Sequence, residues 1–184
     1  METNHERLKY PIGKFEKPAI IENAQIERWI KSIEAFPQQL SQEVRGLSEE
    51  ELEQQYRPDG WTIRQVVNHC ADSHMNSLIR FKLALTEDTP TIKPYQEDRW
   101  AELPDTKKFP VESSLKLLNG LHERWGCLLR NLSDEQLDRQ FKHPETQELI
   151  SLKTNIGIYA WHGEHHLAHV RNAKARLQTN LNEV

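Results

Sequence analysis

Four of the nine histidines of this chain lie within eleven residues, between Tyr159 and His169. Because a helix advances about 100° per residue, residues four apart lie above one another on one face. Two such pairs occur here, His162 with His166 and His165 with His169. A histidine pair of this spacing can offer a divalent metal two imidazole ligands from a rigid support. One isolated pair is equally compatible with surface or hydrogen-bonded core histidines.

The orientation of these histidines follows from their spacing in a predicted helix of residues 151–177. Counted from His162 at about 100° per residue, the apolar positions of that helix fall at roughly 60–80°. Those positions are Leu152, Tyr159, Val170 and Leu177. His166 falls at about 40°, whereas His169 and His165 fall at about −20° and about −60°. The spacing predicts that His162 and His166 lie closer to the interior. His169 remains near enough to be a hydrogen-bond partner or an exchange ligand.

A third ligand has to come from another helix, because two imidazoles do not complete a metal site. The predicted helix of residues 63–85 offers His69 and His74. His74 lies amid the apolar stripe of this helix and could be a hydrogen-bonded core residue. His69 lies on the flank, where a helix borders the interior and can open toward a cleft. The spacing alone does not decide between them.

Four long helices are predicted as the support of these side chains, because apolar residues recur at three- and four-residue steps. The helices cover residues 21–44, 63–85, 111–132 and 151–177. Pro37 is expected to bend the first, since it removes a backbone donor. No sustained alternation of apolar and polar residues predicts a sheet. The predicted fold class is therefore all-α, a four-helix bundle in which the long segment 86–110 is a crossover between two helix pairs.

A short motif occurs twice, once after each of two long helices. Leu47–Leu52 and Leu132–Leu137 both consist of Leu-Ser, three acidic or amide residues, and Leu. A serine cap with acidic residues in the first turn predicts a short helix in each place. A histidine-bearing helix then follows, the first one started by a Thr62–Gln65 capping box and the second preceded by a possible hairpin over 143–150. We interpret this as an internal duplication; the alternative is that two similar turns arose independently.

Composition restricts the class of protein. The chain has 184 residues, 28% of them charged, and a net charge of −4, which predicts a single domain, 1–184. Its basic residues are scattered, so we expect no nucleic-acid partner. There is no run of 18 apolar residues, and because the first 15 residues are polar we expect no signal peptide. Residues 1–20 are expected to form an extended N-terminal arm. We therefore expect a cytoplasmic protein without a membrane partner, in which Cys70 and Cys127 are buried reduced thiols.

Two motifs resemble a known family. Trp61–His74 contains Trp-Thr-Ile-Arg-Gln-Val-Val-Asn-His, and together with Tyr159–His166 it resembles the DinB/YfiT-like metalloprotein superfamily. Tyr10–Gly13 and Tyr56–Trp61 resemble the YfiT/BstA branch of that superfamily. The resemblance spans nearly the whole chain. It implies a four-helix bundle whose metal is held by three histidines.

The resemblance also implies which histidines bind the metal. Carried onto this sequence, the ligands are His69, eight residues after Trp61, and the pair His162 and His166. The sequence departs from the branch pattern at Asn68, where a histidine often precedes the ligand. It also departs at 163–164, where Gly-Glu fills a gap that is often polar or rich in histidine. Neither departure removes a ligand, but both could alter the residues around the metal.

Three neutral imidazoles would leave a divalent ion with its full charge and an open position, as in catalytic sites. Zinc is the expected ion, and nickel would bind at least as well. A water in the open position would have its pKa lowered to about 7, and a thiol there would also ionise. Asp72 or Glu164 could orient a ligand imidazole.

Two reactions are compatible with such a site, and the resemblance implies both. The first hypothesis is a bacillithiol S-transferase, in which the metal activates a low-molecular-weight thiol that attacks an electrophile in detoxification. The alternative is a metal-dependent hydrolase that uses metal-bound hydroxide. A non-catalytic metal-binding stress protein is a further alternative. Arg64, Arg80 and Arg171 are candidates to hold a carboxylate-rich thiol such as bacillithiol, and the resemblance also implies a possible homodimer.

Overall fold

The computed structural model describes residues 4–182, which form nine helices and two short strands. In chain order the elements are α1 (Asn4–Lys9), α2 (Asn23–Val44), α3 (Glu49–Leu52), α4 (Ile63–Thr86), α5 (Glu97–Trp100), α6 (Pro104–Lys108), α7 (Val111–Arg130), α8 (Asp134–Leu137), β1 (Gln140–Lys142), β2 (Leu149–Ser151) and α9 (Leu152–Asn182).

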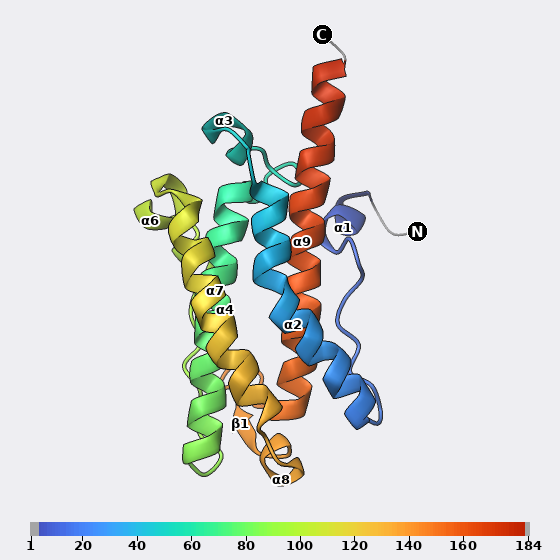
Figure 1. The fold of residues 1–184 in the computed structure, drawn as a ribbon, viewed down its shortest axis with the longest axis vertical. Coiled ribbons are helices and arrows are strands. Elements are labelled where there is room, and N and C mark those ends of the chain that lie inside the picture. Colours follow the sequence, from blue (N-terminus) through green and yellow to red (C-terminus); the bar gives the residue numbers. More distant parts are fainter. Residues whose placement is uncertain (1–3, 183–184) are drawn as a thin grey trace.

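The four long helices α2, α4, α7 and α9 pack as a bundle (Figure 1). Helix α2 packs against α7 and α9, and α4 packs against the same two helices. Helices α2 and α9 run in one direction, whereas α4 and α7 run in the other (Figure 1). The segment 87–110 therefore returns along the length of the bundle before α7 begins, and it carries α5 and α6. The predicted all-α bundle with a crossover between two helix pairs is confirmed.

The starts of the helices follow the capping residues in the sequence. Thr62 accepts a hydrogen bond from the backbone of Gln65, whose side chain accepts one from Thr62 in return, so the predicted capping box starts α4. Ser48 and Ser133 cap the short helices α3 and α8 in the same way. The predicted helix over 21–44 is observed as α2, which continues through Pro37.

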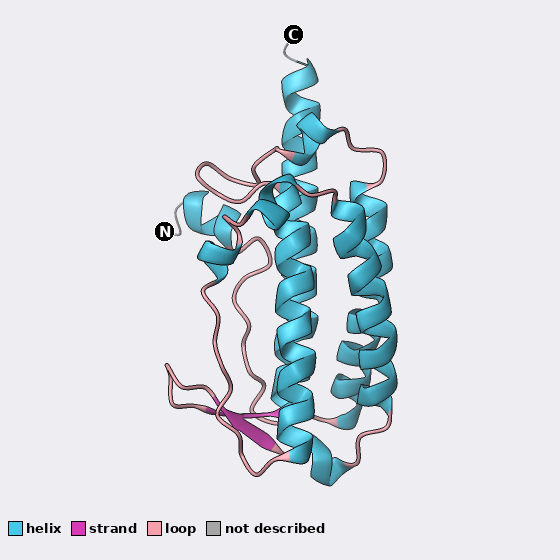
Figure 2. Cartoon of the chain, turned by 90° about the vertical axis from the view of Figure 1, so that its left-hand side faces the viewer, coloured by secondary structure: helices cyan, strands magenta, loops and turns pink. Residues whose placement is uncertain are grey.

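The segments that precede α4 and α9 make matching backbone contacts at the start of each helix. In the first half, Gln55 bridges to Thr62, and the amide of Ile63 donates to the carbonyl of Gln54. In the second half, Gln140 pairs with Ser151, and the amide of Leu152 donates to the carbonyl of Arg139. The second contact belongs to a hairpin, the antiparallel pair β1–β2 (Figure 2), which extends beyond the predicted range of 143–150 at both ends. The local structure thus repeats, as an internal duplication requires.

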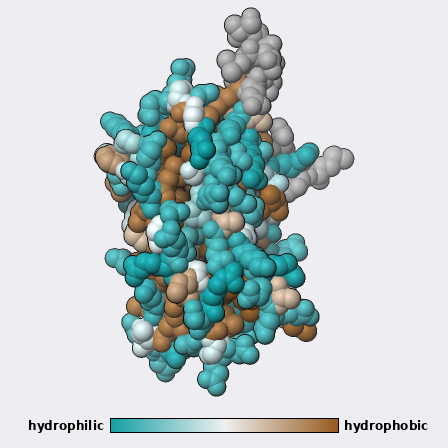
Figure 3. Space-filling model, viewed as in Figure 1, coloured by the Kyte–Doolittle hydropathy of each residue, from teal (hydrophilic) through white to brown (hydrophobic). Residues whose placement is uncertain are grey.

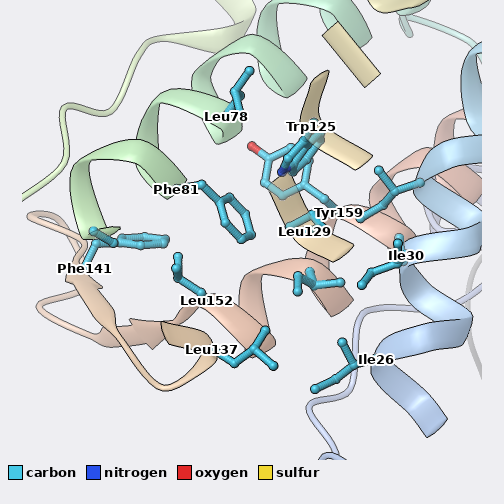
Figure 4. Packing of buried hydrophobic residues seen from close by; sticks show 14 of the residues in the cluster. Ile26, Ile30, Leu78, Phe81, Trp125, Leu129, Leu137, Phe141, Leu152 and Tyr159 are labelled. Atoms are coloured by element: carbon cyan, nitrogen blue, oxygen red, sulfur yellow. The ribbon is translucent and has the colours of Figure 1, made fainter. Parts of the chain in front are cut away.

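Two apolar clusters fill the bundle at different levels along α9. One includes Phe81, Trp125 and Leu152 (Figure 4), and the other includes Phe36, Leu118 and Leu167. Helix α9 contributes residues 152–160 to the first cluster and 167–173 to the second. Its histidines at 162–166 lie between these stretches, so the bundle carries a polar layer between two apolar ones. Hydrophilic residues cover most of the face shown in Figure 3.

Two local predictions were wrong. Residues 1–20 were expected to be extended, yet Asn4–Lys9 forms helix α1; residues 1–3 lie outside the described part. A helix this short gains its stability from packing rather than from an intrinsic period, so the sequence gives little sign of it. Cys70 is buried as expected, but Cys127 is exposed, and both are free thiols. Within residues 4–182, no helix has the length and hydropathy needed to cross a membrane.

Candidate metal centre

The structure brings together the three histidines that the resemblance implied. His69 extends from α4, and His162 and His166 extend from α9, which packs against α4. One nitrogen from each imidazole lies within 4.8 Å of the others, and the two Nε2 atoms of His69 and His162 are 3.2 Å apart. A tetrahedral ion with Zn–N bonds of about 2.0 Å needs its nitrogens about 3.3 Å apart. The three side chains therefore fit a divalent ion with small rotations.

No carboxylate belongs to this group of possible ligands in the part of the chain that the structure describes. His69 and His166 are only 4% and 6% exposed. Burial, reinforced by the neighbouring histidines, lowers the pKa of His69 to about 4 and that of both His162 and His166 well below the ordinary value. At neutral pH all three are neutral imidazoles, which is the form that binds metal.

Each ligand on α9 contacts a further histidine through its Nδ1 atom. His162 Nδ1 is 3.0 Å from His74 Nε2, and His74 Nδ1 is 2.7 Å from His122 Nε2. His166 Nδ1 is 3.4 Å from His169 Nδ1. His74, which the spacing left undecided, is therefore a buried partner of a candidate ligand and not a member of the ligand group.

Sequence reasoning missed His122. It lies four residues after Leu118 and three before Trp125 on the apolar stripe of α7, and it is 2% exposed. Its Nδ1 atom is 2.7 Å from the carbonyl oxygen of Ile33 in α2. A histidine within an otherwise apolar stripe was the signal that could have identified it, because such a residue needs a buried partner.

His165 and His169 are also buried, although their helical positions predicted that they lie farther from the interior. The N-terminal segment covers this side of α9: the ring of Tyr10 lies 5.9 Å from that of His165, and the carbonyl oxygen of Lys9 is 3.1 Å from His169 Nε2. Tyr56 stacks on His169 with ring centroids 3.9 Å apart. Burial therefore does not distinguish the pair His162 and His166 from the pair His165 and His169. The nitrogens do, because only those of the first pair lie close enough to His69 to share an ion.

Asp72 and Glu164 do not orient a ligand, contrary to the prediction. The Glu164 carboxylate accepts a hydrogen bond from Ser32 Oγ, at 3.0 Å. Burial raises the pKa of Asp72 to about 6, and within the described residues its carboxylate makes no hydrogen bond to an imidazole. The groups at the outer nitrogens of the two ligands are His74 of α4 and His169 of α9, not a carboxylate.

A cleft of about 430 Å³ opens onto the three histidines. Aromatic side chains form much of its wall, and Trp61 packs on His69 with ring centroids 4.7 Å apart. Lys9 and Arg57 line the cleft as cations, while the acidic lining residues are Asp59, Glu97 and Asp98. A cavity of about 480 Å³ beside residues 17–21 contains no histidine, so the chemistry favours the first cleft.

The arginines predicted to hold an acidic ligand lie elsewhere. Arg64 is buried in ion pairs with Glu49 and Glu53, each at 2.6 Å, and Arg171 pairs with Glu43 at 2.8 Å. Neither lines the cleft, and nor does Arg80. The carboxylate partners of Arg64 and Arg171 come from other helices or from loops, which the spacing of residues within one helix does not reveal.

Comparison with known proteins agrees with the site and the fold. The DinB superfamily matches residues 32–170 of this chain. Two relatives from strains of Bacillus cereus, each named "Putative metal-dependent hydrolase", are 52% identical over 170 residues. The match covers 92% of this chain and 97% of each relative.

A solved structure agrees along almost the whole chain. It is that of YfiT from Bacillus subtilis, described as "a probable metal-dependent hydrolase with an unusual four-helix bundle topology". The TM-score is 0.91 at 48% sequence identity, and the match covers 94% of this chain and 98% of that one. The resemblance drawn from the two motifs is confirmed. The chain belongs to the DinB superfamily.

Proposed function

We propose that this protein is a metal-dependent enzyme that joins a low-molecular-weight thiol to electrophiles, with a divalent ion held by His69, His162 and His166. The names of the relatives support the coarser part, metal dependence and enzymatic activity. The observation that carries the proposal is a group of three neutral imidazoles, without a carboxylate, that lines an open cleft. Zinc is the expected ion, and nickel is the alternative.

The ligand set supports thiol chemistry. A divalent ion bound by neutral ligands keeps its charge and lowers the pKa of a thiol or water that reaches it. The three histidines would hold the ion, and Trp61 and Tyr56 form an aromatic wall beside it. The thiol proton leaves to solvent. The sulfur forms a bond to an electrophilic carbon, and the leaving group, such as chloride, departs with the bonding electrons.

Two of the five charged residues that line the cleft are cations, and these two support an anionic thiol as substrate. Lys9 and Arg57 both line the cleft, and no ion pair with either is found within the described residues. Cations that lack a protein carboxylate remain available for carboxylates of a ligand. Bacillithiol, the carboxylate-rich thiol that the resemblance implied, is therefore the co-substrate we propose. The homodimer implied by the resemblance stays a prediction.

The experiment compares wild-type protein with His166→Ala, both purified without a histidine tag and then loaded with zinc. We expect about one zinc per wild-type chain and bacillithiol-dependent turnover of a chlorobimane electrophile. His166→Ala should lose at least about 100-fold in rate, because loss of a ligand exceeds the 10–100-fold cost of losing a residue that orients one. The matched control is His143→Ala, which removes a histidine outside the cluster and should leave turnover unchanged. If metal-loaded wild-type protein shows no thiol-dependent rate, the transferase proposal is wrong.

A hydrolase is the second candidate, favoured by Glu97 and by the relatives' names. Glu97 lines the same cleft, and burial raises the pKa of its carboxyl group above the ordinary value. A carboxyl group with a raised pKa is a better proton donor candidate toward a leaving group than an ordinary one. This function predicts ester, amide or phosphoester cleavage in the absence of thiol. A metal-binding stress protein without turnover would bind the ion and catalyse neither reaction.

A further inference from the structure

We propose that His122, acting through His74, and His169 are positioning residues that fix the ring tautomers of His162 and His166. Both ligands then carry their hydrogen on Nδ1 and present the Nε2 lone pair to the ion. This inference rests on the metal binding proposed above, but it concerns the protein alone. Each series of hydrogen bonds starts at a backbone carbonyl, which can only accept a hydrogen bond. That carbonyl therefore decides the tautomer of every imidazole that follows it in the series.

The first chain of hydrogen bonds starts at the carbonyl oxygen of Ile33. His122 Nδ1, at 2.7 Å, must donate to it, so the Nε2 atom of a neutral His122 is an acceptor. His74 Nδ1 must therefore donate to His122, and His74 Nε2 accepts in turn from His162 Nδ1, at 3.0 Å. The Nε2 atom of His162 is left with its lone pair. That atom is the one that lies 3.2 Å from His69 Nε2, within the ligand group.

The chain depends on neutral rings, and its surroundings keep them neutral. His74 and His122 are 1% and 2% exposed, and the ring of Phe36 packs against both, at 4.9 and 5.7 Å between centroids. Burial lowers the pKa of His122, the ring at the carbonyl, to about 4. A neutral imidazole has one donor and one acceptor, so the order of hydrogen bonds cannot reverse while the carbonyl remains in place.

The second chain starts at the carbonyl oxygen of Lys9. His169 Nε2 donates to it at 3.1 Å, so His169 Nδ1 is an acceptor for the Nδ1 hydrogen of His166. The Nε2 lone pair of His166 is again left for the ion. The distance of 3.4 Å between the two Nδ1 atoms makes this contact weaker than those of the first chain. The carbonyl belongs to the end of α1, so the N-terminal helix takes part in orienting a ligand.

Histidines in place of carboxylates behind the ligands have a chemical consequence. A carboxylate hydrogen-bonded to a ligand imidazole raises the basicity of the ligand and donates charge to the metal. Neutral imidazoles orient the ligand without adding negative charge. The ion therefore keeps more of its positive charge, which favours ionisation of a bound thiol at neutral pH.

The test uses metal-free, full-length protein and long-range proton–nitrogen NMR of the imidazole rings, which distinguishes the two tautomers. We expect His122, His74, His162 and His166 as Nδ1–H tautomers and His169 as the Nε2–H tautomer. Finding His162 with its hydrogen on Nε2 would overturn the proposal without any variant. If the tautomers are as stated but zinc does not bind, the proposed function fails and the positioning inference stands.

Two variants at His122 add a second readout. His122→Phe removes the acceptor for His74, so we expect a mixed tautomer at His162 and a zinc affinity lower by about 10–100-fold. His122→Gln keeps an acceptor atom near the position of Nε2 and should restore most of the affinity. His143→Phe, at a histidine that belongs to neither series of hydrogen bonds, is the matched control. Unchanged tautomer and zinc affinity in a folded His122→Phe protein would contradict the inference.

Discussion

Seven histidines form one connected cluster in which each ring contacts another. Its members are His69, His74, His122, His162, His165, His166 and His169. Burial is the first cause that lowers the pKa of the members, so the cluster is neutral at pH 7. The roles of these histidines differ. Three of them can each point one nitrogen at an ion, and the other four supply hydrogen bonds and ring contacts behind those three. A neutral cluster beside Lys9 and Arg57 leaves these cations as the basic groups for an anionic substrate.

Arg57→Gln tests the role of that cation. The guanidinium packs over the ring of Tyr56 and donates to the carbonyl of Pro58, at 3.0 Å, which orients it at the cleft. Because Arg57 would bind the thiol away from the reacting sulfur, we expect KM for bacillithiol to rise roughly 5–10-fold with kcat unchanged. Arg45→Gln, at an exposed arginine that does not line the cleft, should change neither constant. An equal fall in kcat, or no change in KM, would argue against this role.

At the level of elements, α2 packs closely on α9 and brings the Ile33 carbonyl and the Phe36 ring against the histidine layer. Glycines on α9 permit this approach. A Cβ atom at Gly157 would come within 2.8 Å of the Trp29 ring, and one at Gly163 within 2.9 Å of the Phe36 ring. Phe36 also packs on the first histidine chain. Gly163, which departs from the family pattern, thus has a packing reason in this protein.

Gly163→Ala should lower the free energy of unfolding by about 1–3 kcal/mol, since overpacking against a buried ring exceeds the gain of about 1 kcal/mol in helix propensity. The matched control is Gly120→Ala on α7, where a Cβ atom would meet nothing within 4 Å. That change should raise the free energy of unfolding by up to about 1 kcal/mol. Urea denaturation of the metal-free proteins measures both. Stabilisation of similar size in the two variants would show that α2 can move away from α9 at no cost.

At the scale of the whole molecule, the buried histidines link folding to pH. Each has a pKa below its value of 6.5 in an unfolded chain, so the unfolded state binds more protons as the pH falls below that value. Stability is therefore fully present above about pH 6.5 and is lost toward pH 4. Burial raises the pKa of Asp72 to about 6 and also raises that of Glu97, which acts in the opposite sense, but these are two groups against seven.

We expect the free energy of unfolding of the metal-free protein to fall between pH 7.5 and pH 5. The slope is about 1.4 kcal/mol per pH unit for each proton by which the two states differ. Urea titrations in the presence of EDTA measure it. His122→Gln should reduce the slope, because one buried histidine is removed, whereas His143→Gln should not. A constant stability over this pH range would contradict the neutral cluster.

The sequence by itself determined the features that depend on neighbours along the chain. Capping residues such as Thr62 start the helices, apolar stripes give four long helices, and the spacing of His162 and His166 places both on one face. These are local properties, because a helix imposes the same geometry wherever it lies. Membership of the family and the bundle fold followed from motifs of the same local kind.

The tertiary structure alone decided what surrounds each imidazole. It placed His122 of α7 behind His74, the Lys9 carbonyl behind His169, and Lys9 and Arg57 at the cleft in place of the arginines expected there. It also buried the second histidine pair beneath an N-terminal segment that carried no periodic signal. These contacts join residues that are 48 to 160 positions apart in the two hydrogen-bonded cases. Helical spacing gives the direction of a side chain, but only the packing of helices gives the group that it meets.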